Sequence, residues 1–251
     1  MLKNIWNKLY QLGHRVAWRA VTGIYLFCLR KSGKLPPAQS DQPDRNKKTI
    51  YLTFDDGPSN DTERLLNILE RYHVKATFFV VSTSPFLSVL KKTAAMGHTI
   101  GNHTANHVYK ELYKSEASFF DALYRAERMI EAQTGIRTSL MRFPGGSISI
   151  RHHTKEPHLD LTLTQQLEAR GYQYVDWNVC GNDTAGARTP IAVYKNVIQG
   201  VRNRDASVVL LHDIKCYTID AVEMILVWGL RNGYVFLPMD ETSPMAHHKL
   251  T

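Results

Sequence analysis

The sequence predicts an α/β fold, a distorted parallel (β/α) barrel of seven strands with a basic N-terminal extension. Seven short runs rich in β-branched, aromatic and other apolar residues lie between residues 50 and 237, and segments with helical periodicity separate them. A chain of 251 residues with 43% hydrophobic content can bury one sizeable core. We therefore expect one large domain built on a single sheet.

Strand-like runs and helical segments follow one another in a regular order. The first run, residues 50–54, is continuously apolar, and residues 62–71 then repeat leucine at helical spacing. A glycine follows several helical segments, where its tolerance of positive φ suits a helix C-cap; the candidates are Gly97, Gly135, Gly171 and Gly233. Further strands are expected at 76–81, 98–102, 140–143, 172–178, 207–212 and 234–237, and further helices at 114–134, 162–170 and 219–231.

Positive charge is concentrated in the N-terminal extension. The formal net charge is +8, and residues 1–50 hold ten Lys or Arg against two acids, whereas the rest of the chain is balanced. A neutral domain argues against nucleic-acid binding, and a basic extension favours association with an anionic membrane or cell envelope. We divide the chain into a basic and apolar segment (1–31), a polar linker (32–48), the main domain (49–243) and a tail (244–251). Oligomeric state is not predicted.

The apolar run of residues 20–29 leaves three interpretations of the first segment open. Ten residues are too few to span a bilayer as a helix. The run could belong to an export signal without a cleavage site, to an interfacial helix with Trp6, Trp18 and Tyr25 on its apolar side, or to a helix packed against the domain. The expected location is the cell envelope or the cell exterior, with membrane association in the second case and a cytoplasmic location as the alternative.

Two adjacent carboxylates end the first strand-like run. The apolar residues from Tyr51 lead into Asp55 and Asp56, and a Gly-Pro turn follows. Adjacent side chains on a strand point to opposite faces, but the turning backbone at a strand end can bring both into one pocket. One carboxylate could then bind a metal ion while the other accepts a proton. The alternative is an ordinary Asp-Gly turn with solvated acids.

A pair of histidines follows the third run. His103 and His107 are four residues apart, so on the first turn of a helix they would share a face. Two histidines and one carboxylate are a common ligand set for a catalytic divalent metal, and Asp56 or Asp55 could complete the set. The alternative is two surface histidines near a loop.

Charged side chains also follow the fourth and sixth runs. Arg142 presents a permanently charged planar fork that can hold a carboxylate ionised and oriented, and the Pro and Gly residues after it shape a loop whose N–H groups can approach a substrate oxygen. His212 ends a buried-strand pattern. With a nearby acid such as Asp183 it could act as a general acid near neutral pH, and the alternative is a satisfied core histidine.

Taken together, these motifs resemble the five ordered motifs of the polysaccharide deacetylases, the NodB homology domain of carbohydrate esterase family four. The resemblance covers roughly residues 48–240, and five motifs in order at strand ends are a specific signal. The matching residues are 53–58; His103, Thr104 and His107; Arg142, Pro144 and Gly146; the segment 177–183; and Leu210 with His212.

The resemblance implies a role for each matched residue. Asp55 would be the general base, oriented by Arg142, and His212 would be the general acid, tuned by Asp183. The metal ligands would be Asp56, His103 and His107, holding zinc or, as the alternative, another divalent ion such as Co²⁺. Thr104 would brace the histidine loop. The substrate pocket would be formed by Pro144, Gly145, Trp177 and Leu210, with the Gly145 N–H facing the oxyanion.

The activity that the resemblance implies is hydrolysis of an N-acetyl group on an acetylated amino-sugar polymer or oligomer. Peptidoglycan N-acetylglucosamine is the first expectation, followed by chitooligosaccharide and acetylated xylan. A non-catalytic sugar-binding protein and a metal-dependent amidase for a small substrate are the rival functions.

Two departures from the family pattern bear on substrate preference rather than on chemistry. Many members carry an aromatic residue where this chain has Thr184, and often a tyrosine where it has Gly145. The segment 147–160 could form one wall of a substrate groove. Alternatively its histidines, His152, His153 and His158, could form a second metal site, although they follow no established ligand spacing.

Overall fold

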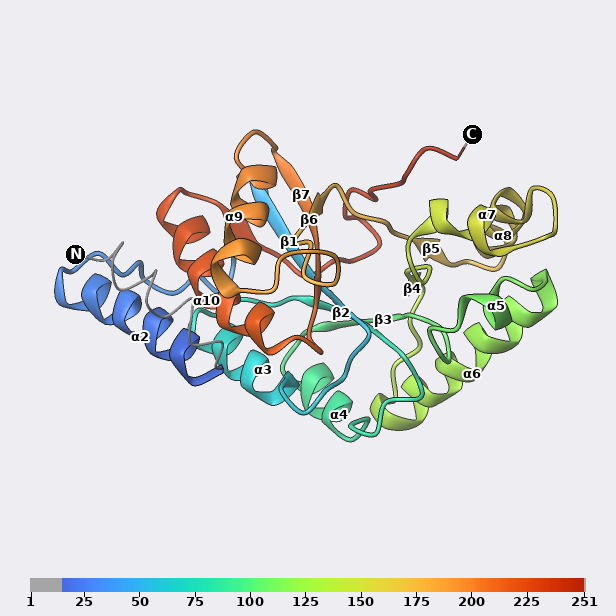
Figure 1. The fold of residues 1–251 in the computed structure, drawn as a ribbon, viewed down its shortest axis with the longest axis horizontal. Helices are drawn as coiled ribbons and strands as arrows, with labels where there is room; N and C mark the ends of the chain where they lie inside the picture. Colours follow the sequence, from blue (N-terminus) through green and yellow to red (C-terminus); the bar gives the residue numbers. More distant parts are fainter. Residues whose placement is uncertain (1–14, 251) are drawn as a thin grey trace.

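Residues 15–250 are described by the computed structural model, and their strands form one parallel sheet that curls into a half-barrel (Figure 1). The order across the sheet is β5-β4-β3-β2-β1-β7-β6, and β8 pairs with the beginning of β1. The predicted distorted (β/α) barrel is therefore confirmed. The strands are β1 (Thr49–Asp55), β2 (Thr77–Val80), β3 (Thr99–Asn102), β4 (Leu140–Met141), β5 (Gln173–Tyr174), β6 (Val179–Cys180), β7 (Ala206–His212) and β8 (Val235–Phe236).

The two longest strands, β1 and β7, lie side by side between β2 and the edge strand β6. They pair in register from Thr49 opposite Ala206 to Asp55 opposite His212. Every residue of β1 is buried, as expected for a strand covered on both faces. Even-numbered positions such as Leu52 pack in the main hydrophobic core, whereas odd-numbered positions such as Tyr51 point to the other face. This alternation places the side chain of Asp55 on the face away from the main core.

Of the strand expected at 172–178 only residues 173–174 form a strand, β5, and the next strand, β6, begins at Val179, which corrects the sequence interpretation. β5 pairs with β4 at one edge of the sheet, whereas β6 pairs with β7 at the opposite edge. Residues 175–178 cross between the edges. The N–H of Val175 bonds to the carbonyl of Met141 at one end, and the N–H of Asn178 bonds to that of Val208 at the other. The crossing segment therefore connects the two edges of the curled sheet.

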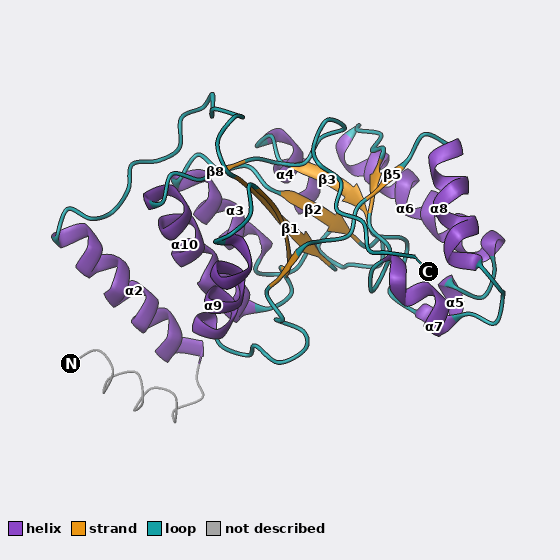
Figure 2. Cartoon of the chain, turned by 90° about the horizontal axis from the view of Figure 1, so that it is seen from above, coloured by secondary structure: helices purple, strands orange, loops and turns teal. Residues whose placement is uncertain are grey.

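The helices form two groups around the sheet (Figures 1 and 2). One group shares the main core with β1 and β7, and the other surrounds a second core beside β4 and β5. The first group contains α2 (Arg15–Lys31), α3 (Thr62–Arg71), α9 (Pro190–Val201) and α10 (Cys216–Arg231). The second group contains α5 (Tyr109–Leu112), α6 (Glu116–Thr134), α7 (Ile150–His153), which follows the 3₁₀ turn Ser147–Ser149, and α8 (Leu159–Ala169). Helix α4 (Val89–Ala95) lies between the two groups.

The four expected helices correspond to α3, α6, α8 and α10 within a few residues at each end. All four expected capping glycines have positive φ, and Gly135 is the left-handed C-cap of α6 with φ 73°. α9 was not expected, although Thr189 caps it and Pro190 begins it, a common arrangement at a helix N-terminus.

The N-terminal helix α2 packs against α10. Val21 and Leu29 are buried, whereas Ile24 and Phe27 on the same helix are exposed. The described part of segment 1–31 is thus a helix packed on the domain, and residues 1–14, with Trp6, lie outside the described residues. Within residues 15–250 no helix is long and apolar enough to cross a membrane. Association of this segment with a membrane or cell envelope stays a prediction.

Candidate active site

The charged residues singled out in the sequence converge at the C-terminal ends of four strands. Asp55 ends β1 and Asp56 follows it, His103 follows β3, Arg142 follows β4, and His212 ends β7. Because parallel strands end at the same edge, residues far apart in the sequence meet there. The structure brings together all seven residues expected to act in catalysis or metal binding.

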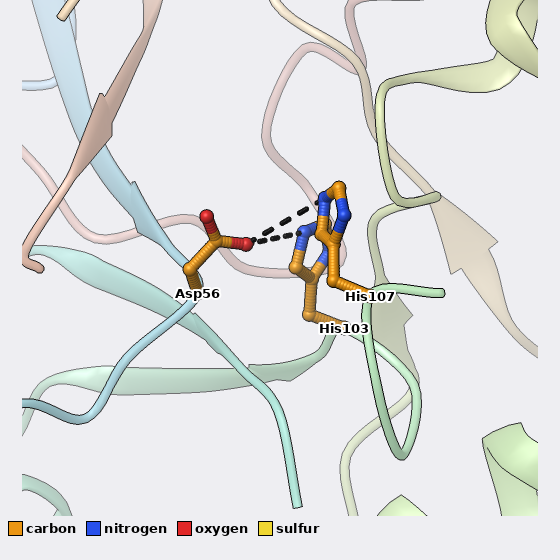
Figure 3. A group of neighbouring side chains, drawn as sticks. All are labelled: Asp56, His103 and His107. Atoms are coloured by element: carbon orange, nitrogen blue, oxygen red, sulfur yellow. Dashed lines mark ion pairs between the residues drawn. The ribbon is translucent and has the colours of Figure 1, made fainter. Parts of the chain in front are cut away.

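Asp56, His103 and His107 form a group that could hold a metal ion (Figure 3). The Oδ1 of Asp56 lies 3.5 Å from Nε2 of His103 and 3.7 Å from Nε2 of His107. Ligands placed tetrahedrally at the usual zinc distances are separated by about 3.4 Å. The three atoms therefore have the spacing of ligands around one shared ion.

The donor atoms fit a divalent metal in chemistry as well as in spacing. The Oδ1 of Asp56 is buried and has no hydrogen-bond partner among the described residues. The Nδ1 of His103 lies 2.8 Å from the carbonyl oxygen of Arg142, so Nδ1 carries the proton and Nε2 presents its lone pair to Asp56. A carboxylate oxygen and an imidazole nitrogen that face each other in this way can share one cation. The group is therefore consistent with a site for a divalent metal ion.

The histidines lie on a loop and not on a helical turn, which corrects the sequence expectation. Thr104 has φ 68°, and its N–H bonds to the side chain of Asn102, so the backbone turns sharply after β3. The hydroxyl of Thr104 donates to the carbonyl of Asn106 at 2.8 Å. Thr104 therefore braces the loop, as the resemblance implied, and α5 begins only at Tyr109.

The electrostatic environment favours an ionised Asp56. Burial opposes ionisation, but the imidazoles of His103, His212 and His107 outweigh it and hold the pKa of Asp56 well below its ordinary value. Burial and the neighbouring His103 lower the pKa of His107. A carboxylate and a neutral imidazole are the forms in which these side chains bind metals.

Arg142 is completely buried, and its guanidinium spans the interior of the curled sheet. Nη1 donates to Oδ1 of Asp55 at 2.8 Å and to the hydroxyl of Thr53 at 2.7 Å. Nε and Nη2 donate to the carbonyls of Val175 and Asp176, each at 2.9 Å. Arg142 therefore fixes the carboxylate of Asp55 relative to the crossing segment 175–178. The other oxygen of Asp55, Oδ2, lies 3.8 Å from Nε2 of His103, at the metal group.

His212 is held from the opposite side by Asp183. The Nδ1 of His212 lies 2.8 Å from Oδ1 of Asp183, and Oδ2 of Asp183 accepts from the His212 N–H and from the hydroxyl of Thr218. Burial alone would lower the pKa of His212, but the hydrogen bond and charge of Asp183 outweigh it and raise that pKa above its ordinary value. Nε2 of His212 faces the metal group, 3.9 Å from Oδ2 of Asp56.

The loop after Arg142 has two glycines with positive φ, and at each of them a neighbouring side chain leaves no room for a Cβ. A Cβ on Gly145 would lie 2.8 Å from the Tyr109 hydroxyl, and a Cβ on Gly146 would lie 2.8 Å from the Trp177 ring. The N–H of Gly145 makes no hydrogen bond among the described residues, and Gly145 is exposed. It is therefore an available donor, and the ring of Trp177 lies against the next residue, Gly146.

The other expected pocket residues lie close to this loop or opposite it. Pro144 is buried, and its carbonyl accepts from the hydroxyls of Tyr113 and Ser149. Leu210 is buried two residues before His212, on the same face of β7 and in register with Thr53. Leu210 is therefore placed to form a wall behind the reacting groups.

Several residues that support the site were not found from the sequence. Asp176 is fully buried and accepts from the N–H and hydroxyl of Ser147 and from the N–H of His248 in the tail. The tail thus packs along the crossing segment next to Trp177. The buried acid at the start of a crossing segment has no signature in the sequence, because its partners come from other parts of the chain.

Asp213 is a second buried acid that supports the site. Its carboxylate accepts from the Thr62 hydroxyl, and burial raises its pKa to about 7. A Cβ on Gly57 would lie within 2.5 Å of that carboxyl group, so only glycine fits the turn after Asp56. The adjacency of Asp213 to His212 is the one signal that could have identified it.

The histidines of segment 147–160 do not form a second metal group. Within residues 15–250, the only cluster of three or more metal-type side chains with suitable spacing is Asp56, His103 and His107. His152 is exposed, and His153 stacks on Tyr109.

Comparisons with known proteins identify the family. Residues 42–164 match the family model described as polysaccharide deacetylase. The catalytic domain of a peptidoglycan N-acetylglucosamine deacetylase from Eubacterium rectale has a similar structure, with a TM-score of 0.79 and 44% identity, covering 85% of this chain and 98% of that one. The chain belongs to the polysaccharide deacetylase family. It is accordingly a hydrolase of carbon–nitrogen bonds other than peptide bonds.

Two further polysaccharide deacetylase relatives illustrate the range of the family. A peptidoglycan-N-acetylglucosamine deacetylase from Bacillus cereus is 30% identical over 205 residues, which are 79% of this chain and 72% of that protein. A domain of a multidomain xylanase from the hindgut metagenome of Trinervitermes trinervoides is 28% identical, with a TM-score of 0.63, covering 77% of this chain and 88% of that one.

Replacement of a metal ligand should abolish metal binding in this deacetylase. We expect His103→Ala to weaken zinc binding by more than the roughly 10–100-fold that is typical of losing an outer-shell partner, because it removes a direct ligand. Isothermal titration with zinc measures the change. The matched control is His152→Ala, which removes an exposed histidine outside the group. Equal zinc affinity in the His103→Ala and wild-type proteins would contradict the ligand assignment.

Proposed function

We propose that this polysaccharide deacetylase removes the acetyl group from N-acetylglucosamine units of peptidoglycan, releasing acetate and leaving a free amine on the sugar. The observation that carries the proposal is that a base and an acid lie beside the metal group, each held by a different partner. Asp55, held by Arg142, lies 3.8 Å from His103, and His212, held by Asp183, lies 3.9 Å from Asp56. An amide hydrolase needs both a base and an acid at the reacting carbon.

Each residue has a role in the proposed reaction. A divalent metal held by Asp56, His103 and His107 would polarise the acetyl carbonyl and lower the pKa of the attacking water. Asp55 accepts the proton that the water loses, and Arg142 keeps its carboxylate oriented toward that water. The Gly145 N–H donates to the oxyanion as it forms. His212 then protonates the departing amine through Nε2, because Nδ1 is engaged by Asp183.

The choice of peptidoglycan as substrate rests on the names of two relatives and on the uneven distribution of charge along the chain. The structurally similar protein from Eubacterium rectale and the relative from Bacillus cereus both carry names that specify peptidoglycan N-acetylglucosamine. The basic N-terminal region suits an anionic cell envelope. A purely sugar-binding role is less well supported, because base, acid and metal ligands are all present and oriented toward one another.

Acetate release tests the proposal. We expect the zinc-loaded protein to release acetate from peptidoglycan faster than from chitooligosaccharides or acetylated xylan, and a chelator to stop release. Asp55→Asn is the matched variant: it should keep zinc and fold but lose roughly 100- to 10,000-fold in turnover, since the amide keeps the shape of the side chain but cannot accept the proton. Release that persists in Asp55→Asn would contradict the assignment of the base. Release from another polymer alone would contradict the choice of peptidoglycan.

The pH dependence of turnover tests the acid. His212 must be protonated to donate, so activity falls as pH rises through its raised pKa. Asp183→Asn removes the charge that raises this pKa, and we expect the alkaline limb of the kcat profile to move to lower pH. A limb that stays in place in Asp183→Asn would show that another group controls it.

A further inference from the structure

Tyr109 lies beside the metal group and over the loop that carries Gly145. It begins α5, two residues after His107, and its ring meets the edge of the His107 ring with centroids 4.9 Å apart. Its hydroxyl lies 2.8 Å from the position that a Cβ of Gly145 would occupy. The phenol therefore stands between a metal ligand and the N–H donor to which the proposed function assigns the oxyanion.

The ring of Tyr109 is held rigidly from two directions. His153 of α7 stacks on it with centroids 4.2 Å apart and planes inclined by 14°, and Tyr113 stacks with centroids 6.1 Å apart and planes inclined by 13°. A stacked aromatic side chain has few alternative positions, so its hydroxyl has a fixed location. Segment 147–160 thus contributes to the site through the imidazole of His153, without providing a metal ligand.

The hydroxyl of Tyr109 is available to a ligand. It has no hydrogen-bond partner among residues 15–250, although the side chain is half-buried. The neighbouring Tyr113 is different, because its hydroxyl is fully buried and donates to the carbonyl of Pro144 at 2.8 Å. The two tyrosines at the ends of α5 therefore have separate roles: Tyr113, its C-cap, supports the loop, and Tyr109 presents a polar group beside it.

The position of the Tyr109 hydroxyl requires a glycine at position 145. With φ 75° and no side chain, it leaves the space into which the Tyr109 hydroxyl and the Ser149 hydroxyl project. A larger residue at position 145 would have to displace both. The space that a side chain at position 145 would fill is therefore occupied by the Tyr109 side chain of α5.

We propose that Tyr109 is a substrate-positioning residue, whose hydroxyl hydrogen-bonds to the acetylated amino sugar bound between the metal group and Gly145. The inference rests on the proposed deacetylase function, since it assigns the sugar to that place. A hydroxyl aligned with a rigid ring recognises a sugar hydroxyl or the acetamido group at little entropic cost. Its contribution belongs to binding and orientation, and the proton transfers remain with Asp55 and His212.

The test compares two single-hydroxyl deletions in the zinc-loaded, full-length protein. Tyr109→Phe keeps the ring and its stack on His153, and we expect KM for an N-acetylglucosamine oligomer to rise about 5- to 10-fold, the value of one lost hydrogen bond. Zinc affinity and the thermal midpoint should stay at wild-type values. Tyr72→Phe, the matched control, removes a hydroxyl that bonds to Glu223 of α10, away from the site, and should leave KM close to wild type.

The outcomes separate this inference from the proposed function. Ordinary wild-type turnover together with an unchanged KM and kcat in Tyr109→Phe would overturn the inference alone. A lower thermal midpoint in Tyr109→Phe, with activity lost only in proportion to the unfolded fraction, would also overturn it, because the role would then be structural. Absence of turnover in the wild-type protein on any acetylated sugar polymer would overturn the proposed function and this inference with it.

Discussion

The site depends on the buried ion pair between the guanidinium of Arg142 and the carboxylate of Asp55. Removing an arginine from water costs several kcal/mol unless its charge and donors are all satisfied. Here Asp55 provides the counter-charge, Thr53 and two carbonyls of the crossing segment accept the remaining hydrogen bonds, and the face of the Phe79 ring lies 4.3 Å away. The same contacts fix the base, join β1 to the segment that connects the sheet edges, and place Trp177 beside the glycine loop.

The site keeps its proton carriers on separate supports. Asp55 is held by Arg142 from the interior of the curled sheet, whereas His212 is held from the far side of β7 by Asp183, which in turn accepts from the Thr218 hydroxyl. Each group is therefore positioned by partners of its own, so the base and the acid of one reaction are held separately. The metal group lies between them, so one bound carbonyl can face both. Tyr109 and Trp177 then flank the loop that would receive the acetyl oxygen.

Much of this arrangement could be predicted from the sequence, because strand ends carry their own signal. Apolar runs that stop at Asp55, Arg142 and His212 indicated where the side chains would emerge, and parallel topology brought them to one edge. The end of β5 at Tyr174 and the crossing of residues 175–178 to the other edge could not be predicted, since periodicity reports local burial and not the pairing partner. The same holds for Asp176 and Tyr109, whose contacts come from distant segments. The helical placement of His103 and His107 failed because Thr104 adopts a left-handed conformation, which its residue type does not indicate.

The most direct test of the central claim, that Arg142 acts by fixing Asp55, is a double-mutant cycle on turnover. Acetate release from peptidoglycan by zinc-loaded Arg142→Lys, Asp55→Asn and the double variant is compared, with circular dichroism to verify folding. If Arg142 acts through Asp55, the double variant should lose no more activity than Asp55→Asn alone. Losses that multiply in the double variant would contradict the account, because Arg142 would then contribute to catalysis by a route independent of the base.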